Sequence, residues 1–208
     1  MSDKIKSLRY LLLFIALCGI FPEAYGQTKV QFGRLNLIAP LTYKDGDSDD
    51  SNYNIEDSER SASGYGLSLV FSNGFGVGFN QIKQVVEQTT TFKNYFNYVS
   101  GTEEIVDMRV LDLTFTFGKN VPFTLGWGYL LGGDVEVEYS NPLCTQFNRT
   151  SDDITGYSLL MDVGIPFGQN YNFVAGYRYT SINITFPGLS DNFPRQYSDF
   201  TLGLGYVF

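Results

Sequence analysis

From residue 28 onward, bulky apolar residues alternate with small or polar ones, and this pattern constrains the fold more than any other feature of the sequence. Successive side chains of a β-strand point to opposite faces of its sheet, so a period of two predicts strands with one apolar face. The C-terminus shows it most clearly, where small or polar residues separate Phe200, Leu202, Leu204, Tyr206 and Phe208. The chain is therefore expected to be all-β.

Eight segments carry this alternation, at residues 31–39, 64–71, 75–80, 111–117, 123–132, 157–165, 171–180 and 200–208. The connections are short at 72–74, 118–122 and 168–170, and long and polar at 41–62, 88–104, 140–156 and 186–196. Short periplasmic turns at one rim and long extracellular loops at the other are typical of a transmembrane β-barrel. The sequence thus predicts an eight-stranded antiparallel barrel with both termini in the periplasm.

The volume of the bore decides which face of each strand points outward. An eight-stranded barrel is only just wide enough for its inward side chains, so bulky residues at every inward position would overpack it. The apolar face is therefore expected to point outward. Lipid is the environment that tolerates such a continuous apolar surface, because soluble proteins rarely expose more than a few hundred Å² of it.

The N-terminal residues 1–26 have the composition of a secretory signal peptide. Lys4, Lys6 and Arg9 precede an apolar stretch of about a dozen residues, and Ala24-Tyr25-Gly26 resembles a cleavage site. A membrane-spanning helix needs roughly 20 apolar residues, so a permanent anchor is the weaker interpretation. Residues 27–208 are expected to form the barrel domain.

The charge and the side-chain inventory of residues 27–208 exclude several functions. Of the 14 Lys and Arg and 22 Asp and Glu, residues 1–26 hold three and two, which leaves 11 bases, 20 acids and a net charge of −9. A nucleic-acid partner is not expected, because phosphate binding requires a concentrated basic surface. The chain contains no histidine, which excludes the Ser-His-Asp and Cys-His catalytic arrangements, and no enzymatic activity is expected. Cys144 remains without an intramolecular disulfide partner.

The ending Phe200-x-Leu202-x-Leu204-x-Tyr206-x-Phe208 resembles the C-terminal signal of small outer-membrane barrels. With the alternation over residues 28–208, the chain resembles the OmpA transmembrane-domain, OmpX and OmpW superfamily. The resemblance implies insertion among outer-membrane lipids, and recognition by the barrel-assembly machinery through Phe208.

Charged residues at inward positions are the first candidate site. Simple alternation places Arg34, Asp112, Asp162 and Arg178 in the lumen, and Asp134, Glu136, Glu138 and Asp199 also inward but nearer the outer end. Buried charges are tolerated when they are paired or hydrogen-bonded, so a structural ion-pair network that plugs the lumen is the leading interpretation. The alternative is a gated, narrow pore in which Arg34 or Arg178 exchanges acidic partners.

The first long polar segment contains a possible calcium site. Asp45, Asp47, Asp49 and Glu56 occupy positions one, three, five and twelve of a calcium-loop spacing, although Asp50 stands where that loop has glycine. The alternative is a solvated acidic loop. No other cofactor is expected.

The sequence therefore predicts an outer-membrane barrel with a structural or surface-binding role through acidic extracellular loops. A narrow channel or transporter for small or hydrophobic solutes is the alternative, and a soluble lipid-binding calyx ranks third.

Overall fold

The computed structural model describes residues 30–38, 43–45, 48–49, 53–92, 98–118, 121–167, 169–189 and 192–207. Within these ranges, side chains are described from Glu59 onward, except at Thr90, Phe92 and Tyr98. Eight long strands dominate it: β1 (Val30–Ile38), β4 (Tyr53–Phe71), β5 (Phe75–Phe92), β6 (Tyr98–Phe117), β7 (Phe123–Tyr139), β9 (Ile154–Phe167), β10 (Tyr171–Thr185) and β11 (Asn192–Val207). Shorter elements are β2 (Tyr43–Asp45), β3 (Ser48–Asp49), β8 (Arg149–Ser151) and a 3-10 turn at Thr145–Phe147.

The long strands form a nearly closed antiparallel barrel. They lie side by side in the order β1-β11-β10-β9-β7-β6-β5-β4, and β1 also pairs with β4, which joins the two ends of the sheet. The predicted eight-stranded, all-β fold is thus confirmed. No helix in the described part of the chain is long and apolar enough to cross a membrane.

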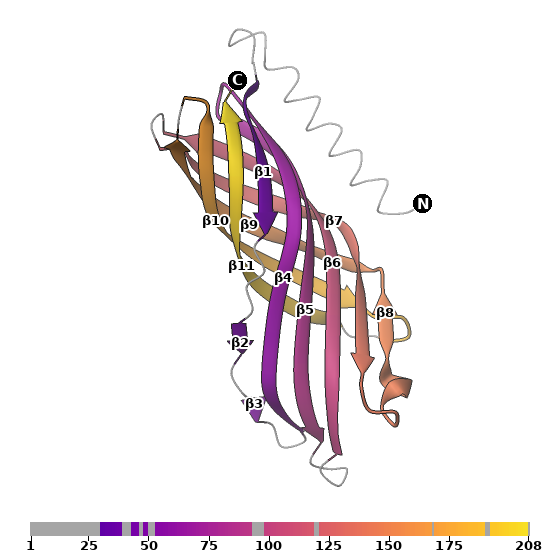
Figure 1. Ribbon diagram of the computed structural model, residues 1–208. Coiled ribbons are helices and arrows are strands. Elements are labelled where there is room, and N and C mark those ends of the chain that lie inside the picture. The colour runs from indigo at the N-terminus through magenta and orange to yellow at the C-terminus, as the bar shows by residue number, and fades with distance from the viewer. Residues whose placement is uncertain are drawn as a thin grey trace, which may run out of the picture.

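Four neighbouring strands are much longer than the alternation predicted. β4, β5, β6 and β7 contain 19, 18, 20 and 17 residues and extend through much of the segments expected to be loops. Figure 1 shows them projecting beyond the barrel at the end opposite the C-terminus, with β2 and β3 beside β4 and β8 beside β7. The projecting sheet is defined here as residues 53–63, 83–92, 98–108 and 133–139 of these strands.

Around the barrel proper, bulky side chains point outward as predicted. Trp127 is 51% exposed and Leu204 is 54% exposed, whereas Ser158 and Gly203 on the opposite faces are buried. Aromatic rings gather beside the short turns, where ring centroids lie 5.1 Å apart for Phe117 and Phe123, and pairs at Phe75–Phe115 and Phe167–Tyr171 are similarly close. An apolar belt with an aromatic border suits the lipid-facing surface of a membrane barrel.

Toward the projecting sheet, the interior becomes apolar. A buried cluster, called here the apolar plug, consists of Ala62, Ile82, Val106, Met108, Val110, Leu130, Val135, Ile154, Ile182, Ile184, Phe186 and Tyr197. The outward faces at this level carry charged residues such as Lys83, Glu103 and Glu136. The expectation that small and ionic residues fill the whole bore is therefore wrong at this end, because the outward face here is polar and the inward face holds the core.

A β-bulge in β7 corrects a second expectation. Arg109 pairs with Gly132 while the next residue of β6, Val110, pairs with Leu130, so Leu131 is an extra residue in the ladder. The bulge reverses the alternation beyond it. Asp134, Glu136 and Glu138 are consequently exposed on the outer face rather than in the lumen, and Val135 is buried in their place.

Candidate functional site

The centre of the bore holds a buried ion pair. The Arg178 guanidinium on β10 donates two hydrogen bonds to the carboxylate of Asp112 on β6, of which the Nη1–Oδ1 bond measures 2.9 Å. Arg178 Nη1 also donates to Ser158 Oγ at 2.7 Å, and Asn80 Nδ2 donates to Asp112 Oδ2 at 2.6 Å. The four side chains come from four strands, β10, β6, β9 and β5, so the network ties the wall together across the bore.

Glycine provides the space for this network. A Cβ atom at Gly128 would lie 2.5 Å from Asp112 Oδ1 and 2.2 Å from Ser158 Oγ. No real side chain tolerates such contacts, so the small residues of the inward face are what allow a guanidinium–carboxylate pair to fit inside an eight-stranded barrel.

The predicted lumen residues also include Asp162 and Arg34, for which the structure shows fewer contacts. Asp162 is buried on β9, and Thr201 Oγ1 lies 3.4 Å from its Oδ1. Arg34 lies between Ser68 and Gly205 in the backbone register of β1, and its side chain lies outside the described residues. The structure thus brings Arg178 and Asp112 together, and a functional role for the full set stays a prediction.

A second polar cluster surrounds Asp199, which is buried as the alternation predicted. Gln84 Nε2 donates to Asp199 Oδ2 at 2.7 Å, and Arg60 Nη2 lies 3.9 Å from Asp199 Oδ1. Arg60 also donates to the Ser198 carbonyl, and its guanidinium lies 5.7 Å from the centre of the Tyr197 ring. Sequence reasoning missed Arg60 and Gln84 because both belong to segments it left outside the strands.

Further out, Arg195 closes the interior. Its guanidinium binds the Glu104 carboxylate through Nε at 2.9 Å and Nη2 at 2.8 Å, and Tyr197 donates to Glu104 at 3.3 Å. The outward apolar run of β11 begins at Phe200, so these groups lie beyond the apolar belt. The hydrogen bonds to Glu104 raise the pKa of Arg195, and burial raises the pKa of Tyr197, so one remains charged and the other neutral.

Four glutamates stand in one row on the outer face of the projecting sheet. Glu59 lies opposite Glu87, Glu87 opposite Glu103, and Glu103 opposite Glu138. With Thr89, Gly101 and Ser140 they line a hollow of about 660 Å³. Like charges directly opposite each other destabilise a sheet, so this row costs stability and gives the face a strong negative charge.

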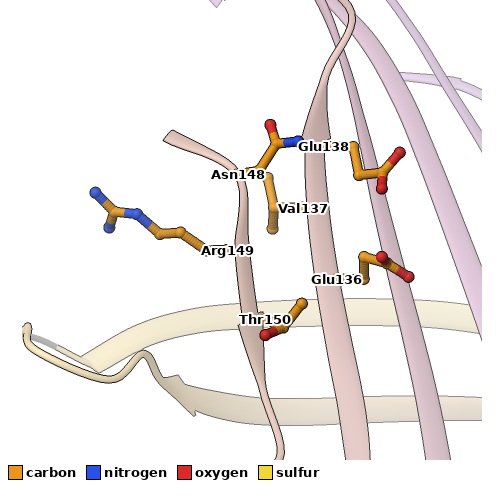
Figure 2. A pocket seen from close by; sticks show the side chains of 6 residues that line it. All are labelled: Glu136, Val137, Glu138, Asn148, Arg149 and Thr150. Carbon is orange, nitrogen blue, oxygen red and sulfur yellow. The ribbon is translucent and has the colours of Figure 1, made fainter. Parts of the chain in front are cut away.

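A smaller hollow of about 130 Å³ lies between β7 and β8 (Figure 2). Its lining residues are Glu136, Val137, Glu138, Asn148, Arg149 and Thr150. Figure 2 shows Arg149 pointing away from both glutamates, so it does not neutralise them. Asn148 Oδ1 accepts a hydrogen bond from the Tyr139 amide at 2.9 Å, which fixes the loop against β7. Cys144 in this loop is a free, buried thiol.

The predicted calcium site falls largely outside the described residues. The backbone at Asp45, Asp49 and Glu56 belongs to β2, β3 and β4, whereas Asp47 and all four side chains are not described. Elsewhere in the described part of the chain, no group of three or more metal-binding side chains is close enough to hold an ion. Calcium binding stays a prediction.

The fold is decided by a nearly closed ring of eight strands that carries an outward apolar belt, with β1 paired to both β11 and β4. The chain has the fold of a small outer-membrane β-barrel. It is similar to the crystal structure of Neisserial surface protein A (NspA), with a TM-score of 0.52 and 11% identity, covering 88% of this chain and 100% of that one.

Two further solved barrels are more distant from this one. The outer membrane protein OprG from Pseudomonas aeruginosa has a TM-score of 0.41 and 11% identity, covering 88% of this chain and 98% of that one. The outer membrane protease OmpT from Escherichia coli has a TM-score of 0.41 and 9% identity, with coverages of 87% and 95%. No known protein family and no curated protein matches the sequence of the barrel.

Proposed function

We propose that this barrel is a non-enzymatic outer-membrane protein that holds an acidic β-sheet surface outside the membrane for structural or binding purposes. The observation that carries the proposal is the reversal of polarity along the barrel. The outward face is apolar around Trp127 and Leu204 but carries Glu59, Glu87 and Glu103 on the projecting sheet. Such a surface suits water rather than lipid.

The filled bore supports a surface role over transport. The Arg178–Asp112 pair crosses its centre, and the apolar plug, with Ile82 and Met108 at 0% exposure, fills the bore toward the projecting sheet. Both hollows lie on the sheet exterior, away from the bore. A hydrated solute passing through would have to displace a desolvated ion pair and a close-packed core, each of which is stable in place.

The row of glutamates supports binding of a positively charged partner. A cluster of one sign of charge raises the local concentration of oppositely charged molecules and speeds their association. Exposed carboxylates that repel one another become more stable when cations approach. The acidic groups therefore favour a basic partner.

Export and orientation of the chain follow from its placement in the outer membrane. Residues 1–26 direct secretion, the barrel-assembly machinery recognises the chain end at Phe208, and outer-membrane lipids surround the apolar belt. Both termini lie in the periplasm, and the projecting sheet lies outside the cell. Single cysteines introduced at Ser140 and at Asn73, on opposite rims of a Cys144→Ser variant, test this orientation by labelling of intact cells with a membrane-impermeant maleimide. Labelling at Ser140→Cys alone is expected.

Liposome swelling and planar-bilayer conductance test whether the bore is closed. The protein is expected to give no solute-dependent swelling and a flat current trace. The matched variant is Met108→Gly, which removes part of the apolar plug without touching the ion pair. If liposomes that contain the unmodified protein swell in a small sugar, the sugar passes through the bore. That result would overturn the surface role as the main function.

A narrow gated channel is a second candidate, and one observation favours it. Asp199 lies directly opposite Arg178 in the register of β10 and β11, and Arg178 Nε and Asp199 Oδ1 are both without a hydrogen-bond partner. Arg178 thus has a second carboxylate beside it. Rare conductance steps that change frequency in Arg178→Ala would support this candidate, and a flat trace in both forms would reject it.

A further inference from the structure

Two cations occupy the outer face of the barrel where its apolar belt ends. Lys83 on β5 and Arg109 on β6 are both exposed. Lys83 lies two outward positions after Phe79, and Arg109 lies one outward position before Leu111 on the neighbouring antiparallel strand. Gln81 pairs with Arg109 and Lys83 pairs with Asp107, so the two cations are diagonal neighbours on adjacent strands. Diagonal neighbours in a sheet lie within reach of each other's long side chains.

The polar side chains between these cations are engaged with one another. The Tyr65 hydroxyl donates to Gln81 Oε1 at 3.0 Å, and Gln81 Nε2 donates to both Asp107 oxygens at 3.3 and 3.4 Å. Asp107 lies opposite Lys83, yet no ion pair within 4.0 Å joins Lys83 or Arg109 to an acid in the part of the chain whose side chains are described. Both cations are therefore available to an external anion.

The bulge in β7 leaves open space beside Arg109. Gly132 on β7, which pairs with Arg109, has a φ of 144°, a backbone conformation that residues other than glycine rarely adopt. Even a Cβ atom there would come no closer than 3.9 Å to the Arg109 guanidinium. The guanidinium is therefore not covered by a side chain from this position of β7.

We propose that Lys83 and Arg109 together bind a phosphate group of a membrane lipid at the projecting-sheet edge of the apolar belt. The cations are continuous with the lipid-facing surface, so a headgroup whose acyl chains lie against Phe79 and Leu111 meets them without leaving the bilayer. Guanidinium and ammonium groups are the usual protein partners of phosphate. The proposal rests on the membrane placement of the barrel in the proposed function, but not on its binding of a basic partner.

The test measures lipid retention by native mass spectrometry of the detergent-purified full-length mature barrel. The probes are a bis-phosphorylated lipid A and the same lipid with both phosphates removed. Lys83→Gln and Arg109→Gln are each expected to weaken binding of the phosphorylated lipid about fivefold, and the double variant more than tenfold. Binding of the dephosphorylated lipid is expected to be weak and unaffected.

Arg149→Gln is the matched control, because Arg149 is an exposed cation on β8 outside the belt edge. It should leave binding unchanged. Competition by millimolar inorganic phosphate without any preference for the lipid would reject a lipid site in favour of a general anion site. Equal retention by the double variant would show that both side chains merely extend into the headgroup region, and would overturn the proposal. The maleimide and swelling assays test the proposed function, and their results do not depend on lipid binding by Lys83 and Arg109. Failure of one proposal is therefore distinguishable from failure of the other.

Discussion

The projecting sheet continues four strands of the barrel proper but has the opposite polarity. On β6, Phe115 and Phe117 are exposed in the barrel while Asp112 is buried. Further along the same strand, in the projecting sheet, Glu103 is exposed and Val106 is buried. In each region the side chains match the solvent that their outer face meets, lipid in one and water in the other.

A strand that crosses a bilayer can continue as a strand in water if its two faces exchange roles. β5 and β6 achieve this by a change in sequence at constant alternation, since beyond Asn80 and Asp112 their inward positions include the apolar Ile82, Met108 and Val106. β7 uses a bulge instead, which moves its inward face by one residue at Leu131. The result is a barrel with an ionic centre beside an apolar core.

The largest expected effect comes from breaking the ionic centre. Arg178→Ala leaves the Asp112 carboxylate buried without its cation and is expected to cost about 3–5 kcal/mol in the free energy of unfolding. Urea unfolding in lipid vesicles, followed by the fluorescence of Trp127, measures it. The double variant Arg178→Met with Asp112→Leu removes both charges and should recover most of the loss. If the double variant is as unstable as the single one, the loss in the free energy of unfolding comes from side-chain packing and not from the unpaired charge.

The apolar plug provides the next test. Met108→Ala removes a fully buried side chain and is expected to cost about 2–5 kcal/mol, as cavities in water-soluble cores do. Ile105→Ala, on the half-buried outer face of the same strand, serves as the control and should cost less. The same urea titration applies. Equal losses would indicate that this part of the barrel lacks a true interior.

Two arginine substitutions on the outer face of β7 compare the lipid-facing region with the projecting sheet directly. Leu125→Arg places a cation against lipid and is expected to cost about 2–4 kcal/mol. Glu136→Arg, exposed beyond the bulge, should change the free energy of unfolding by less than about 0.5 kcal/mol. Comparable costs at both positions would contradict the assignment of lipid to one region and water to the other.

The smallest effect concerns the glutamate row. Glu103 has a glutamate opposite it on both sides, so Glu103→Gln should stabilise the sheet by about 0.2–1 kcal/mol. The gain should shrink as salt screens the repulsion. Glu136→Gln is the control, because Glu136 lies opposite Ile105 and has no such neighbour on β6. A gain that persists in 1 M salt would point to a cause other than charge.

Alternation in the sequence predicted the strand count, the outward belt and the burial of Asp112, Asp162 and Arg178, because those features follow from period two alone. It could not predict the projecting sheet, whose outward residues are polar and resemble loop sequence. Strict alternation along β7, without the bulge, also placed Glu136 and Glu138 inward. The Gly132-Gly133 pair inside a strand was the available signal, since glycine there often marks a bulge.

The loop that follows β7 gives the protein an intrinsic reporter. Cys144 is 8% exposed, and its backbone is held by hydrogen bonds to Asn141 and Phe147 at 2.8 Å each. A thiol reagent therefore reaches this sulfur when the loop opens, and the labelling rate measures how often that happens. Occupation of the outer surface by another molecule would become visible as slower thiol modification, without any probe having to be engineered into the chain.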